Sequence, residues 1–154
     1  MALWQFTFRM LPKQVLVVAH GKIPVKVSYD EFRELPSWDI RNYKIALFHL
    51  LDTNFTRSDF QGHNFATWGN PDETNFILFF DGVNVDFTIR LDLRALEQKT
   101  LRTIEEIGGL LDAVIVTELG SVFDPKSKSL VKDIKASKAF KFVKDPSGFF
   151  TQQS

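Results

Sequence analysis

Apolar and polar residues alternate without interruption over residues 83–94, which read VNVDFTIRLDLR. Successive side chains of a β-strand point to opposite faces, so this segment is expected to form a strand with one buried side and one solvent-facing side. The preceding run FILFF at 76–80 is wholly apolar, and Asp81-Gly82 joins the two segments as in a tight β-hairpin. The pattern therefore predicts a half-solvated antiparallel sheet at the centre of the fold.

Three segments near the N-terminus are also predicted as strands. Residues 4–10 (WQFTFRM) alternate, residues 14–19 (QVLVVA) are mostly apolar, and residues 23–27 (IPVKV) alternate again. Pro24 has no backbone N–H to donate to a neighbouring strand, so the third segment is expected at a sheet edge.

Two helices are predicted between these strands and the hairpin. Ser28 and Glu31 have the spacing of a capping box, which predicts a short helix directly after Ser28. Residues 39–51 carry apolar residues at helical spacing and are predicted as a helix capped by Ser37. A strand over residues 44–51 is the alternative for the same segment.

The C-terminal third predicts one further strand and two more helices. Residues 101–111 form an amphipathic helix that contains Gly108-Gly109, residues 113–116 (AVIV) form a strand, and residues 130–143 form a last helix capped by Ser129. Together the segments predict an α+β fold in a single domain over residues 1–154, with a mostly antiparallel sheet of about six strands and helices packed on one face.

Residues 52–75 (DTNFTRSDFQGHNFATWGNPDETN) lack clear periodicity and are predicted as a long polar and aromatic loop. Loops of this length are uncommon in a compact domain unless they are functional or disordered. Aromatic residues and arginine dominate the energetics of protein interfaces, so we expect Asp59, Phe60, His63 and Trp68 to contact a protein partner. The alternative is that the rings fold inward as a flap over the sheet.

The polar side of the 83–94 strand carries a second candidate contact surface, made of Asp86, Arg90, Asp92 and Arg94. Neighbouring side chains on one side of a strand stand about 7 Å apart, which suits a recognition patch. An ordinary solvated face with compensating charges explains the same residues without any function. Exposed ion pairs contribute only about 0–1 kcal/mol, so the fold does not depend on these charges.

Catalytic and metal-binding signatures are not evident. The chain has no cysteine, which excludes disulfides, thiolate catalysis and Cys-ligated zinc. His20, His49 and His63 have no metal-ligand spacing, and no glycine-rich phosphate-binding motif is present. We therefore expect no enzyme activity, no cofactor and no metal. The alternative is a small-molecule-binding or hydrolytic site that uses His63 with Asp59 or Asp86.

Composition and charge narrow the class of partner. The net charge is zero, with 44% hydrophobic and 25% charged residues and 16 phenylalanines, which is typical of a globular chain with an aromatic core. Most acidic residues lie within 28–119, and a separate acidic face would suit a basic partner. The lysines of 126–144 have no accompanying arginine, so nucleic-acid binding is not expected. No segment predicts a membrane span or a signal peptide, which favours the cytosol.

The second half of the chain resembles small immunity proteins of bacterial polymorphic and contact-dependent toxin systems. The resemblance covers residues 74–151 and rests on FILFFDGVNVDFTIRLDLR, the helix after it, DAVIVTELGSVFDP and SKAFKFVKDPSGFF. It implies a cytosolic, non-enzymatic protein that neutralises a toxin domain by covering its active site. A structural subunit of a larger assembly is a further alternative, and the oligomeric state is left open.

Overall fold

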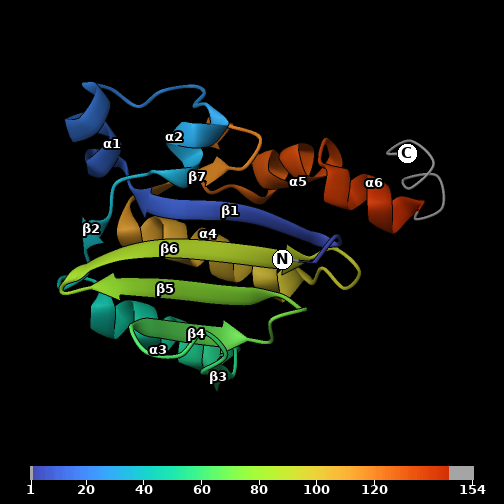
Figure 1. Cartoon of the computed structure of the whole chain (residues 1–154), viewed down its shortest axis with the longest axis horizontal. Coiled ribbons are helices and arrows are strands. Elements are labelled where there is room, and N and C mark those ends of the chain that lie inside the picture. The colour runs from blue at the N-terminus through green and yellow to red at the C-terminus, as the bar shows by residue number, and fades with distance from the viewer. Residues whose placement is uncertain (1, 146–154) are drawn as a thin grey trace.

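An antiparallel sheet of eight strands lies at the centre of the computed structural model, which describes residues 2–145 (Figure 1). Seven strands follow the order β3-β4-β5-β6-β1-β7-β8, and β2 pairs with one end of β6. The α+β class is confirmed, with more strands than the sequence predicts. The strands are β1 (Gln5–Pro12), β2 (Trp38–Asp39), β3 (Arg57–Ser58), β4 (Phe65–Gly69), β5 (Asn75–Asp81), β6 (Asn84–Asp92), β7 (Ala113–Thr117) and β8 (Val122–Phe123).

Two helices form a layer behind the sheet in Figure 1, and these are α3 and α4. Buried leucines and isoleucines of α3 and α4 join the inner sheet residues in one hydrophobic cluster. A shorter helix, α2, touches the opposite face near β1, where the Arg9 guanidinium lies 5.4 Å from the centre of the Phe32 ring. The helices are α1 (Lys13–His20), α2 (Tyr29–Arg33), α3 (Lys44–Asn54), α4 (Gln98–Leu111), α5 (Ser127–Lys135) and α6 (Lys138–Lys144).

The predicted hairpin is confirmed as the β5–β6 pair. Its register runs from Asn75 opposite Arg90 to Asp81 opposite Asn84, with Gly82 at a φ of 63° in the turn. The four apolar side chains on the inner side of β6 are at most 1% exposed; they are Val85, Phe87, Ile89 and Leu91. Burying four such side chains contributes about 1.5–3 kcal/mol each, which fixes the face that β6 turns inward.

Two of the predicted N-terminal strands are wrong. Residues 14–19 belong to the helix α1, and residues 23–27 contribute only an isolated bridge between Lys26 and Ser121. The valines of α1 favour a strand by propensity, but the helix buries Leu16 alone and leaves Val18 77% exposed. Gly21, in the left-handed conformation, closes α1 by donating its N–H to the Val17 carbonyl.

The predicted long loop over 52–75 is also wrong. α3 extends to Asn54, and β3 and β4 occupy residues 57–58 and 65–69. Residues 55–56 and the short turns 59–64 and 70–74 join these elements to each other and to β5. The strand β4 (FATWG) escapes detection because it is short and lies among polar residues, whereas its pairing with β5 comes from distant sequence.

The remaining helices differ from the prediction mainly at their ends. The Ser28 capping box is present, with the Ser28 side chain accepting from Glu31 N–H. The helix predicted over 39–51 begins at Lys44, so the alternative strand over 44–51 is wrong. The helix predicted over 130–143 is interrupted at Ser137, whose hydroxyl caps α6. Ser129 lies inside α5 and does not cap it.

Gly108 and Gly109 give a matched test of packing around α4. A Cβ on Gly108 would lie 2.0 Å from the Pro125 Cγ, whereas a Cβ on Gly109 would meet open space. We expect Gly108→Ala to lower the free energy of unfolding by about 1–3 kcal/mol because the rigid proline ring must move. Gly109→Ala should raise it by about 0.5–1 kcal/mol through helix propensity. Chemical denaturation measures both, and equal effects would contradict this packing.

Candidate functional site

One face of β4, β5 and β6 has no helix over it in Figure 1. The strand register arranges its side chains in rows that cross the strands. We call this surface the open face. Its rows, which continue onto β1, are Phe65, Phe79 and Asp86; then Thr67, Ile77, Thr88 and Arg9; then Gly69, Asn75, Arg90 and Thr7. Of these residues Thr67, Ile77, Asn75 and Thr7 are buried, and the others are at least partly exposed.

An aromatic pair lies in the first row of the open face. Phe65 and Phe79 are opposite each other, and their ring centres are 5.0 Å apart. Phe79 is 38% exposed, although aromatic rings of this size are usually more deeply buried. Aromatic side chains have few rotamers, so the pair presents apolar area at a low entropic cost on binding.

Arg90 in the third row is half-buried and carries no ion pair with any residue between 2 and 145. Its buried Nε has no hydrogen-bond acceptor, and the Oδ1 of the adjacent Asn75 has no donor. Burial lowers the pKa of Arg90. Each unpaired buried polar atom costs about 1–3 kcal/mol, so this row disfavours the isolated fold.

Asp86 and Arg9 complete the charged part of the open face. Burial is the main cause that raises the pKa of Asp86, and Asp81 adds to it, while the nearby Arg9 opposes the shift. Burial likewise lowers the pKa of Arg9, whose guanidinium donates to the Arg33 carbonyl. Both charges are therefore partly desolvated before any partner binds.

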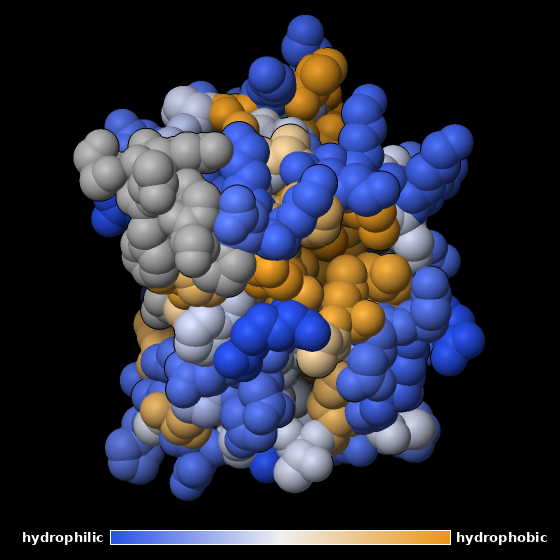
Figure 2. Space-filling model, turned by 90° about the vertical axis from the view of Figure 1, so that its right-hand side faces the viewer, coloured by the Kyte–Doolittle hydropathy of each residue, from blue (hydrophilic) through white to orange (hydrophobic). Residues whose placement is uncertain are grey.

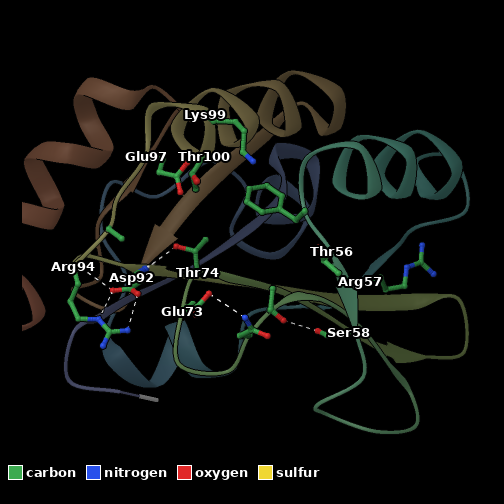
Figure 3. A pocket seen from close by; sticks show the side chains of 14 residues that line it. Thr56, Arg57, Ser58, Glu73, Thr74, Asp92, Arg94, Glu97, Lys99 and Thr100 are labelled. Carbon is green, nitrogen blue, oxygen red and sulfur yellow. Dashed lines mark hydrogen bonds and ion pairs between the residues drawn. The ribbon is translucent and has the colours of Figure 1, made fainter.

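A cavity of about 810 Å³ lies at the end of the sheet next to the third row (Figure 3). Its walls come from β3, the turn 70–74, the end of β6 and the first turn of α4. Gly69 lines the cavity and also belongs to the open face. Figure 2 looks onto this end of the molecule and shows apolar side chains gathered in the middle, with hydrophilic side chains around them.

The turn 70–74 is held by side chains from two other parts of the chain and by Asn75, which directly follows the turn. Its main-chain carbonyls accept hydrogen bonds from Trp4 Nε1, Gln5 Nε2, Asn75 Nδ2 and Arg94 Nη2. The exposed carboxylates of Asp72 and Glu73 are consequently attached to a well-fixed backbone. A rigid acidic wall is already ordered before any ligand arrives.

Asp92 and Arg94 form an ion pair at the edge of the cavity rather than a free recognition patch. Arg94 Nη2 lies 2.9 Å from Asp92 Oδ2, and its Nε lies 2.9 Å from Oδ1. This hydrogen bond is the main cause that raises the pKa of Arg94. Asp92 is 5% exposed, so it is largely hidden from solvent. The pair and the Trp4 ring, 4.0 Å from the guanidinium carbon, anchor the turn 70–74.

Trp68 is not available for contact with a partner, so its predicted role is wrong. Its side chain is fully buried, and its Nε1 donates to Asp52 Oδ1 at 2.7 Å. That bond is the largest cause that lowers the pKa of Asp52, with Arg57 contributing further. The parity of FATWG, in which Ala66 and Trp68 face inward, is the signal that identifies Trp68 as a core residue.

The other residues predicted in the long loop lie in the turn 59–64. Asp59 and His63 are exposed there, and Phe60 is half-buried. Among the described residues, no hydrogen bond or ion pair joins His63 to Asp59 or Asp86. Within residues 2–145 no group of three or more His, Asp or Glu is arranged to hold a metal ion.

None of the helices between residues 2 and 145 combines the length and hydrophobicity that crossing a bilayer requires. Comparison with protein families, with curated proteins and with solved structures finds no match to this chain. The open face and the adjoining cavity are therefore the candidate sites that the geometry offers.

Replacing Trp68 should lower the free energy of unfolding much more than replacing Phe79. Trp68→Ala should lower the free energy of unfolding by about 3–5 kcal/mol, because it leaves a cavity and removes one hydrogen bond from Asp52. Phe79→Ala should cost roughly 1 kcal/mol, because its ring is already partly solvated. Urea denaturation followed by circular dichroism measures both values. A Trp68→Ala cost as small as that of Phe79→Ala would contradict the burial described above.

The pH dependence of the free energy of unfolding of Asp86→Asn tests whether Asp86 is desolvated on the open face. A raised folded-state pKa means that the folded protein binds this proton more tightly than the unfolded chain. The contribution of Asp86 to the free energy of unfolding should thus fall as pH rises through the carboxyl range, and Asp86→Asn should remove that contribution. The variant should gain stability relative to wild type between acidic and neutral pH, with Asp59→Asn as the exposed control. A difference that is independent of pH would contradict the prediction.

Proposed function

We propose that this chain is a non-enzymatic protein-binding module of immunity type, which neutralises a bacterial toxin domain by covering it. The open face carries the proposal. It combines an exposed aromatic pair with half-buried charges, and it belongs to a sheet whose other side is packed by α3 and α4. Such a face is rigid before binding, which lowers the entropic cost of association.

Arg90 supports binding more strongly than an ordinary surface charge does. Its guanidinium has lost part of its hydration without gaining an ion pair, and the residue opposite it on β5, Asn75, has an unpaired Oδ1. A partner main chain offers both a carbonyl acceptor and an N–H donor. Residues that weaken the isolated fold in this way are found preferentially at functional sites.

The partner expected from the charges is basic. Asp81 and Asp86 lie on the hairpin side of the open face, and Asp72 and Glu73 are exposed at the cavity. Acidic groups on a binding surface increase the association rate with a basic partner and disfavour acidic ones. A toxin domain that acts on nucleic acid has such a basic surface, and covering it would block its substrate.

A growth-rescue experiment tests the proposal. The chain is co-expressed with the toxin domain encoded beside its gene, and growth and complex formation are measured. Wild type should restore growth, whereas Phe79→Glu and Asp86→Lys should abolish rescue while remaining folded. Ile45→Glu is the matched control, because Ile45 is 88% exposed on α3 and lies away from the open face. Failure of the wild type to bind or protect would overturn the proposal.

Arg90→Met separates a binding role from a structural one. Methionine keeps the apolar stem and removes the unpaired charge, so the free energy of unfolding should stay constant or rise by about 1 kcal/mol. Binding of the toxin domain, measured by calorimetry, should weaken by at least about tenfold because a buried contact is lost. A variant that loses stability and keeps its affinity would show that Arg90 serves the fold.

A further inference from the structure

The cavity at the end of the sheet contains carboxylates that are not neutralised. Among its cationic residues, Arg57 pairs with Asp52, Arg94 pairs with Asp92, and the Lys99 ammonium donates to the Asn54 carbonyl. Glu73 and Glu97, which also line the cavity, make no ion pair with any residue between 2 and 145. Glu73 accepts one hydrogen bond, from Asn70 Nδ2. Lys99 also lacks an ion pair, so the lining charges without an ion-pair partner are two negative and one positive, and the balance is negative.

Thr100 adds an independent observation on the wall formed by α4. It is 4% exposed and lines the cavity beside Glu97 and Lys99, yet its hydroxyl forms no hydrogen bond with any described residue (Figure 3). Thr103 on the same helix instead donates to the Lys99 carbonyl at 2.9 Å. Thr100 lines the cavity and its hydroxyl is not used by another described residue, so it can accept a hydrogen bond from a donor group that enters.

The cavity also fits the shape of a long cationic side chain. Its volume of about 810 Å³ lies within the range of pockets that enclose small ligands. The half-buried Phe55 ring forms part of the wall and can cover the methylene groups of a guest. Its ring already lies 5.2 Å from the Lys99 ammonium, so it tolerates a nearby cation. Glu73 extends from the immobilised turn 70–74 and needs little reordering.

An anion is the competing guest, because the first turn of α4 presents free N–H groups and a positive dipole end. Glu97 is the N-cap residue of α4 and already places a carboxylate at that end. Glu73 and Asp92 lie on the facing walls. An entering anion would meet the carboxylates of Glu73 and Glu97, while Arg57 and Arg94 are already paired with Asp52 and Asp92.

We propose that the cavity receives a basic side chain, arginine or lysine, from the partner protein. This inference rests on the proposed function and identifies the part of the partner that this end of the molecule recognises. Glu73 and Glu97 bind the charged group from two sides, Thr100 accepts a hydrogen bond from it, and Phe55 contacts its stem. Together these groups give the site a preference for a planar guanidinium, which donates in several directions at once.

The test uses N-acetyl-arginine methylamide as the probe and follows backbone amides by NMR. Saturable shifts are expected at residues 70–74 and 97–100. The double variant Glu73→Gln with Glu97→Gln should weaken binding by about tenfold or more, and Thr100→Val by several-fold. Glu34→Gln with Glu106→Gln is the matched control, because both of these glutamates are exposed outside the cavity, and it should bind as wild type does. N-acetyl-lysine methylamide should bind more weakly.

Three results would overturn the cavity assignment: no saturable shift with the arginine probe, unchanged binding by the Glu73 and Glu97 double variant, or binding of acetate or phosphate instead. A chain that protects against the toxin domain but shows any of these results refutes the cavity assignment alone. A chain that binds the arginine probe at this cavity but does not protect refutes the toxin function alone.

Discussion

Burial of one side of the β5–β6 hairpin is the constraint on which the other features depend. The inner parity of β6, from Val85 to Leu91, is packed against the helix layer together with Phe76 and Leu78 of β5. Because strand side chains alternate, that burial determines which residues face the other way. Asp86, Thr88 and Arg90 lie on the open face because Val85, Phe87 and Ile89 cannot leave the core.

The same constraint explains why function is expected at one face and one end of the sheet. α3 and α4 cover the inner side, so side chains there serve packing. The opposite side keeps partly desolvated charges and an exposed aromatic pair, neither of which the core requires. The turn 70–74 lies at the end of the open face, where four side chains hold its backbone in place. It presents the carboxylates of Asp72 and Glu73 there. Stability and recognition are thus assigned to opposite sides of one sheet.

Local patterns in the sequence predict the hairpin, the capping box at Ser28 and the amphipathic helix α4, because each depends on neighbouring residues alone. The strand β4 and the burial of Trp68 could not be predicted in that way, since both follow from pairing with β5. For the same reason the aromatic pair Phe65–Phe79 and the row of Asn75 and Arg90 emerge only from the register. Asp86 and Arg90 were predicted on the correct side of β6, while the cavity had no signal in the sequence.

Cross-saturation NMR on a complex with the toxin domain proposed as partner is the sharpest test of the open face. Saturation applied to the toxin domain should attenuate signals of β4, β5 and β6 on the open face, with Phe79 and Arg90 among the strongest. Attenuation confined to the outer surfaces of α3 and α4, with the open face unchanged, would contradict the account.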